Sequence, residues 1–348
     1  MAQLSFKRIA LFLLPLMALA SGCATDRQII SQAADAHTEL EPAVITDETL
    51  ERYVQAIGDR VVEAAKELSD QGYGPKAHKS EETEWMFQDI QFHLVNSPTL
   101  NAFTTGGKHI YLYSELFRSS KTEDEFAAVV AHEFAHIYGR HVQKGTNRQY
   151  AILGSAAAAA VGGALIAGED NYMTGAAVGG GMGLAAGQFL GLGFTRSDEN
   201  EADEMGFDFY VRAGWDPEQF SGFFQTMIDK GHDKTPEIAS SHPKLSERVK
   251  NAERRAAELP DNAKQLRRDN IASGARFEKL QDRAKKLAKD LPADKSLEAA
   301  QLMLAAFPSC VAPEPLPEQK EAQQKILNSM DESNAAETRS TSKKRKRD

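Results

Sequence analysis

Apolar residues recur every three or four positions from Asp47 to Gly72, which predicts a helix over that stretch. A second stripe follows Thr122 and runs through the HEFAH segment. Thr122 and Glu125 predict a capping box at its start, in which the threonine accepts from a free backbone N–H and the glutamate reaches back. The stripes consist of Leu50, Val54, Ile57, Val61, Ala65 and Leu68, and of Phe126, Val129, Val130, Phe134 and Ile137.

Alternating residues between these helices predict a small sheet. Ile90, Phe92 and Leu94 alternate with polar neighbours, and residues 110–113 follow the turn-rich segment 104–107. Further helices are predicted from Asp216 to before Gly231, over residues 245–258, and around Phe277, Leu280, Ala284, Leu287 and Leu291, which have heptad spacing. The fold class is therefore α+β and predominantly helical.

Composition divides the chain into five segments. We expect a lipoprotein signal peptide at 1–22, a lipid-anchored tether at 23–46, where polar residues lack sustained periodicity, and a principal domain at 47–258. A helical extension at 259–311 and a disordered tail at 312–348 complete the prediction.

The leader carries the features of secretion and lipidation. Lys7 and Arg8 precede an apolar run that is too short to span a bilayer, and residues 20–23, Ala-Ser-Gly-Cys, resemble a bacterial lipobox. That resemblance implies a lipid on Cys23, whereas the alternative is an ordinary signal peptide with an incidental cysteine. Ala24 after the cysteine suggests an outer-membrane lipoprotein that faces the periplasm of a Gram-negative bacterium. Cys310 is the only other cysteine, so a disulfide framework is excluded once Cys23 is lipidated.

Two further features bear on the class of protein: the net charge, and the Gly/Ala-rich residues 151–194. A net charge of −9 argues against nucleic acid as a partner, and the basic run at 343–347 is interpreted as a solvated tail. Residues 151–194 could form a double membrane span. We favour a hairpin of closely packed helical segments near the site, because Gly and Ala insert only weakly into a bilayer.

The sequence His132-Glu133-Phe134-Ala135-His136 has the HExxH pattern of zinc peptidases. Side chains four apart lie on one face of a helix, so both histidines can bind one ion. Glu133 then projects beside the metal, where it can take a proton from a water molecule. The alternative is a buried helix with two histidines satisfied by other partners.

A catalytic zinc needs a third protein ligand. The metzincin pattern HExxHxxGxxH requires a third histidine at position 142, but this chain has Val there. The nearby His141 would point away from the metal if the helix continued past His136. Glu199 and Asp203 lie four residues apart, so one could bind zinc while the other holds a histidine by its second nitrogen. Glu201 would face away from both.

These motifs together resemble the gluzincin peptidases related to HtpX and the CAAX prenyl proteases. The resemblance rests on HEFAH, on Glu199 and Asp203 in an E-x-x-A-D pattern, on Ser241-His242-Pro243 with Arg248, and on Asn101-Ala102-Phe103 and Gly106-Gly107 upstream. It covers residues 48–255 and is nearest to the shorter periplasmic lipoprotein members. Thr105 replaces a proline that is frequent before the paired glycines.

The resemblance implies a zincin-like domain with one zinc ion per chain. It implies that His132, His136 and Glu199 hold the metal and that Glu133 is the general base. Asp203 would support a ligand, and His242 and Arg248 would lie beside the cleft as further catalytic residues, with the histidine able to occupy the open metal position.

The expected function is a zinc metalloendopeptidase that cleaves misfolded or unassembled envelope proteins. An extended substrate is expected to pair with the sheet edge near residues 110–113, and the membrane is contacted through the N-terminal lipid. The alternatives are a chaperone-like outer-membrane assembly factor with little proteolysis, and a structural lipoprotein. The sequence does not fix an oligomeric state.

Overall fold

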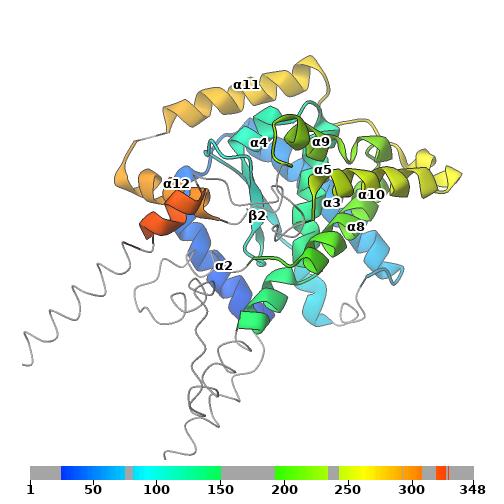
Figure 1. Ribbon diagram of the computed structural model, residues 1–348, viewed down its shortest axis with the longest axis horizontal. Helices are drawn as coiled ribbons and strands as arrows, with labels where there is room; N and C mark the ends of the chain where they lie inside the picture. The colour runs from blue at the N-terminus through cyan, green and yellow to red at the C-terminus, as the bar shows by residue number, and fades with distance from the viewer. Residues whose placement is uncertain are drawn as a thin grey trace, which may run out of the picture.

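A computed structural model describes residues 25–74, 81–149, 193–233, 243–291, 293–307, 319–326 and 328 (Figure 1). Cys23, His242 and all but the last two residues of the predicted 151–194 hairpin lie outside these ranges. No helix within them is both long enough and apolar enough to cross a bilayer.

The three short strands follow one another along the chain, with helices before and after them. The strands are β1 Gln91–Val95, β2 Ala102–Thr104 and β3 His109–Tyr113. The α-helices are α2 Asp26–Leu40, α3 Glu48–Asp70, α4 Ser114–Ser119, α5 Glu123–Tyr138, α8 Arg196–Ala213, α9 Gly222–Asp229, α10 Leu245–Glu258, α11 Ala275–Asp290 and α12 Lys295–Ala306. The 3₁₀ helices are η1 Glu41–Ala43, η3 Glu81–Phe87, η6 Pro217–Gln219 and η8 Asp261–Leu266, and residues 141–149 form a further helix. The α+β, predominantly helical class is confirmed.

The sheet has the order β1-β3-β2, with β1 parallel and β2 antiparallel to β3. The two predicted strands are β1 and β3, whereas β2 lies in a segment that the sequence analysis did not assign to a strand. Because β3 is the central strand and is paired on both sides, the expected pairing of a substrate with residues 110–113 is wrong. Backbone groups of that strand already bond to its neighbours.

The two faces of the sheet carry different side chains, because neighbouring residues of a strand point to opposite faces. Phe92 lies on the face covered by α3, so close that a Cβ on Gly58 would fall 2.1 Å from its ring. His93, His109 and Tyr111 lie on the other face, beneath α2. Figure 1 shows α2 and α12 on one side of the strands and α3, α5 and α8 on the other.

Helix α5 forms the centre of the domain, and all sixteen of its residues are buried. Its start is capped by Thr122, whose Oγ1 accepts from the Glu125 N–H at 3.2 Å. The second hydrogen bond of the predicted capping box, from the Thr122 N–H to the Glu125 carboxylate, is wrong. That carboxylate accepts from the Lys121 N–H at 2.8 Å instead. The helix nevertheless begins at Glu123, directly after the Thr122 cap, as the predicted box requires.

Two buried carboxylates at the start of α5 bind the segment that leads to α11. Glu123 accepts from the backbone N–H groups of Ile271 and Ala272 at 2.8 and 2.6 Å. Asp124 accepts from the Asn270 amide at 2.5 Å and from the Asp216 N–H at 3.2 Å. Since both carboxylates are at most 4% exposed, these bonds satisfy charges that would be costly to bury alone.

The helical extension is present as α11 and α12. Its heptad stripe buries Phe277, Leu280 and Ala284 against the domain, with α11 beside α4. Helix α12 packs on α2 and η1, and Tyr113 of β3 donates to the Leu304 carbonyl at 2.6 Å. In the structure these two helices pack on the domain itself.

Two segments expected to lack regular structure are ordered helices, so these parts of the prediction are wrong. Residues 26–40, expected to belong to a tether, form α2, which begins with a capping box between Thr25 and Gln28 and buries Ile29, Ala33, Ala36 and Leu40. Residues 319–326, expected to be disordered, are helical and bury Ala322 and Ile326. In both cases tertiary packing orders a segment whose local pattern is dominated by polar residues.

Candidate metal centre

The two histidines of the HExxH motif lie one turn apart on α5 with their Nε2 atoms 3.0 Å from each other. His132 is 1% and His136 0% exposed. Glu133 follows His132 directly and is also fully buried. The helix thus presents both imidazoles to one point, as the spacing predicts.

Helix α8 brings Glu199 to the same point. Thr195 and Asp198 form a capping box that begins this helix, which places Glu199 in its first turn. The Glu199 carboxylate lies 3.4 Å from Nε2 of His132 and 3.9 Å from Nε2 of His136. We refer to His132, His136 and Glu199 as the central site.

The central site fits a zinc ion. Nitrogen and oxygen ligands at about 2.0–2.2 Å from a tetrahedral zinc lie roughly 3.3 Å from one another. One ligand atom from each residue can be chosen so that all three lie within 4.8 Å of one another, and the shortest separations are 3.0 and 3.4 Å. Small side-chain adjustments are therefore sufficient for these residues to enclose the ion.

Close approach of α5 and α8 depends on Gly206. A Cβ at this position would lie 3.1 Å from both the backbone N and the Cα of His132. Such a distance is shorter than an ordinary van der Waals contact, and the atoms belong to helix backbone that cannot turn aside. Gly206 therefore sets the distance at which the glutamate of one helix meets the histidines of the other.

Asp203 holds the second nitrogen of His132. Its Oδ1 lies 2.9 Å from Nδ1 of His132, and Arg248 donates to the same carboxylate at 2.6 and 2.8 Å. The Arg248 guanidinium lies 4.0 Å from the centre of the Phe224 ring and is only 3% exposed. Arg248 thus reaches His132 on its Nδ1 side, whereas Glu199 lies at Nε2.

The charges around His132 favour a cation at the central site. Burial lowers the pKa of His132, but its hydrogen bonds to Asp203 and Glu199 outweigh this effect and raise the pKa to about 9. Burial lowers the pKa of His136 well below its usual value. Burial has the opposite effect on a carboxyl group and would raise the pKa of Asp203, but Arg248 and His132 hold that pKa below its usual value. These groups therefore stabilise a cation between them, either a proton on His132 or a metal ion.

His141 holds the second nitrogen of His136, which the sequence analysis did not anticipate. Its Nδ1 lies 2.9 Å from Nδ1 of His136, and its Nε2 lies 3.3 Å from Glu201, which accepts from Lys144 at 2.8 Å. The prediction assumed a continuing helix, but α5 ends at Tyr138 and Arg140 has a φ of 56°. Gly139, which directly follows the last residue of α5, was the signal that the sequence offered.

The resulting arrangement orients both imidazoles. With Nε2 of His136 bound to a metal, its Nδ1 carries the proton and donates to His141, whose own proton then lies on Nε2 and points to Glu201. The hydrogen bond from His141 lowers the pKa of Glu201 to about 2, so this carboxylate remains ionised. As expected, Glu201 faces away from the central site. Phe194 stacks on His136 with ring centres 4.0 Å apart.

The fold and the central site are those of the gluzincin class of zinc metallopeptidases. Residues 51–256 match the profile of peptidase family M48. Because this match covers more than half of the chain, the protein belongs to peptidase family M48. The predicted resemblance is confirmed.

Relatives include two groups of named proteases. The beta-barrel assembly-enhancing proteases of Yersinia pestis and Escherichia coli are 29% identical over 219 residues and 28% identical over 236 residues. These alignments cover 62% and 67% of this chain but 41% and 44% of the relatives. The mitochondrial metalloendopeptidase OMA1 of Saccharomyces cerevisiae is 27% identical over 171 residues, which are 46% of this chain and 45% of OMA1. The alignments thus span less than half the length of these relatives.

Proposed function

We propose that the protein is a zinc-dependent endopeptidase that cleaves misfolded or unassembled proteins of the cell envelope. The observation that carries the proposal is the central site itself: two imidazoles one helical turn apart, a carboxylate from α8 between them, and a separate support behind each imidazole. Family membership and the proteases among its relatives support the same activity.

In this mechanism His132, His136 and Glu199 hold the metal and Glu133 moves the proton. Zinc supplies a Lewis acid that polarises the peptide carbonyl and makes water more acidic. The Glu133 carboxylate, fixed on α5 directly after a ligand, takes the proton from the attacking water and delivers it to the leaving amine. Asp203 and His141 hold the proton on Nδ1 of each ligand, so that both Nε2 lone pairs face the metal. Arg248 acts through Asp203 as a positioning residue.

The decisive experiment compares Glu133→Gln with the wild type. Loss of the general base should lower cleavage of an unfolded protein such as casein by about 10²–10⁴-fold. The variant should still bind zinc, because Glu133 is not a ligand. Glu204→Gln is the matched control, since this α8 glutamate is 55% exposed and pairs with Arg255. Full cleavage by Glu133→Gln would overturn the assignment.

The names of the bacterial relatives favour a second candidate, an assembly factor that binds clients at the central site and cuts rarely. Complementation of a deletion strain distinguishes the two functions. A peptidase function requires that Glu133→Gln fails to rescue the strain, whereas rescue by the variant assigns the physiological role to assembly.

The proposed location is the outer membrane, on the periplasmic side, with Cys23 as the lipidated residue. The support is the lipobox-like sequence with Ala24 after the cysteine. Labelling with a radioactive fatty acid should mark the wild type and not Cys23→Ser. A labelled Cys23→Ser variant would place the lipid elsewhere.

A further inference from the structure

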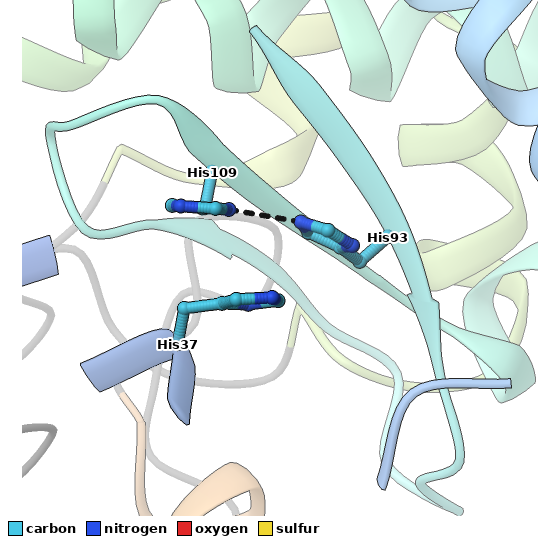
Figure 2. Close-up of side chains that lie close together, drawn as sticks. All are labelled: His37, His93 and His109. Carbon is cyan, nitrogen blue, oxygen red and sulfur yellow. Dashed lines mark hydrogen bonds between the residues drawn. The ribbon is translucent and has the colours of Figure 1, made fainter. Parts of the chain in front are cut away.

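Three histidines from distant parts of the chain meet on the α2 side of the sheet. Figure 2 shows the rings of His37 from α2, His93 from β1 and His109 from β3 gathered in one small volume. The His37 ring stacks on the other two with centres 4.5 and 4.2 Å away. Nε2 of His93 lies 3.0 Å from Nδ1 of His109. We refer to these three residues as the sheet cluster.

Sheet register explains why two of these histidines are neighbours. His109 pairs with Gln91, and His93 pairs with Tyr111, two residues further along each strand. Residues two apart on a strand share a face, so both imidazoles project from the same side of adjacent strands. Helix α2 then places His37 over the gap between them, with its Nδ1 3.1 Å from the Tyr111 hydroxyl.

Three imidazole nitrogens form a set of donors that suits a divalent transition-metal ion. One nitrogen from each of the three rings can be chosen so that all three lie within 4.8 Å of one another. Imidazole nitrogen is a preferred ligand of Zn²⁺, Cu²⁺ and Ni²⁺, and three imidazoles with one open position form a known zinc coordination set. Burial lowers the pKa of His93 to about 3 and of His109 to about 4, so both rings are neutral at pH 7.

We propose that His37, His93 and His109 form a second metal site, which binds Zn²⁺ or a similar divalent transition metal. It is separate from the central site and goes beyond the single zinc ion implied by the family resemblance. Bound metal would connect α2 to β1 and β3, and so fasten a helix that lies outside the matched residues 51–256 to the peptidase sheet.

A surface cleft beside the sheet cluster provides a route for the ion. His37 and His93 line a surface cleft of about 710 Å³, which Glu41 also lines. In the stack the nitrogen lone pairs lie in nearly parallel planes, so metal binding requires rotation about the Cβ–Cγ bonds. This torsion has a broad energy profile in histidine, and the backbone positions need not change. Glu41 favours a positive charge at His37, while Lys108 opposes one at His109.

A third group with ligand spacing, His141 with Asp198 and Glu201, does not support the same proposal. Lys144 binds Glu201 at 2.8 Å and Arg148 binds Asp198 at 2.7 Å. Protein cations therefore already neutralise those carboxylates, and His141 serves His136. The sheet cluster has no such competing cation hydrogen-bonded to its rings among the described residues.

The test counts zinc in the full chain, purified without a histidine tag, stripped with a chelator and then reloaded with Zn²⁺. We expect two equivalents in the wild type and one in His93→Phe and in His109→Phe. Phenylalanine is the matched substitution because it keeps a ring in the stack and removes only the nitrogens. Glu199→Ala should also retain one equivalent, in the sheet cluster, which separates failure of this proposal from failure of the central site.

Affinity and spectroscopy give readouts independent of peptidase activity. Competition with a chelator should show that each phenylalanine variant binds the second ion at least about tenfold more weakly. Loss of a residue that only supports a metal ligand already weakens metal binding by about tenfold, so loss of a ligand should weaken it by at least as much. Co²⁺ loaded into Glu199→Ala should give visible absorption that the double variant with His93→Phe lacks. If a phenylalanine variant does not fold, His37→Ala on the half-buried side of α2 replaces it, with circular dichroism as the check on folding. A wild type that binds one zinc ion only, or an unchanged second equivalent in these variants, would overturn the proposal.

Discussion

The central site and the sheet cluster both bring imidazoles together, but they surround them with different groups. In the central site two histidines meet a carboxylate, and their distal nitrogens reach Asp203 and His141 at 2.9 Å. In the sheet cluster three half-buried rings contact Tyr111 and one another. The first arrangement contains the negative charge that a buried cation requires, whereas the second consists of neutral donors.

This difference separates two kinds of metal binding. Carboxylates behind or beside an imidazole fix its tautomer and stabilise the bound cation, so the central site is prepared for a permanent ion. Neutral stacked rings must turn before they can bind, and the half-buried cluster adjoins a surface cleft. We therefore expect the central ion to resist chelators and the ion of the sheet cluster to exchange.

The largest effect should come from Glu199→Ala. Removal of the only carboxylate ligand leaves two imidazoles, fewer than the three protein ligands of a catalytic zinc site. We expect loss of the central zinc and of measurable peptide cleavage, with metal content and casein hydrolysis as the measurements. Glu204→Ala on the same helix should behave like the wild type. Zinc and activity retained by Glu199→Ala would show that another residue is the third ligand.

Gly206→Ala should disturb the central site without touching a ligand. The added methyl group would lie 3.1 Å from the His132 backbone, so α8 must move away from α5. We expect the free energy of unfolding to fall by about 1–3 kcal/mol, as for other overpacked cores. Urea denaturation measures this loss, and zinc affinity should weaken with it while the sheet cluster is unchanged. Equal stability of variant and wild type would mean that the helices are not in close contact.

His141→Phe tests the support behind His136. The variant keeps a ring in the buried position but removes the acceptor for the Nδ1 proton. Zinc affinity should fall about 10–100-fold, the usual effect of a supporting residue, while the fold is retained. Glu201→Gln lies one hydrogen bond further from the metal and should lower the zinc affinity less. An unchanged zinc affinity in His141→Phe would mean that His141 serves packing alone.

The smallest effect is expected from Tyr111→Phe in the sheet cluster. It removes one hydrogen bond to His37 and leaves all three ring nitrogens in place. The free energy of unfolding should fall by about 0.5–1.5 kcal/mol, the net value of one hydrogen bond. Both zinc equivalents should remain. Loss of the second equivalent would make the tyrosine hydroxyl part of that site.

Local patterns were sufficient to predict the helix and the residues of the central site. HExxH fixes its own geometry because residues four apart share a helical face. Periodicity alone left Glu199 and Asp203 interchangeable, and the structure separates them, with Glu199 near both Nε2 atoms and Asp203 at Nδ1 of His132. The residue roles remain proposals, as do lipidation of Cys23 and the role of His242.

The remaining features depend on contacts between distant segments. His37, His93 and His109 share no spacing that a motif could encode, since sheet register and helix docking bring them together. Helix α2 was missed because alanines at two of its four buried positions add little to an apolar stripe, although its capping box was present in the sequence. Strand β2 was missed because it is only three residues long and leads into a turn.

The bonds between α5 and residues 270–272 bear on how small a working version of this enzyme can be. Similarity to the family ends at residue 256, yet Glu123 and Asp124 receive donors from Asn270, Ile271 and Ala272. Truncation at residue 258 would leave two anions in the interior with part of their hydrogen bonds missing, at the base of the helix that carries the chemistry. The folding unit therefore extends past the residues that match the family, and shortened expression clones should retain these downstream residues.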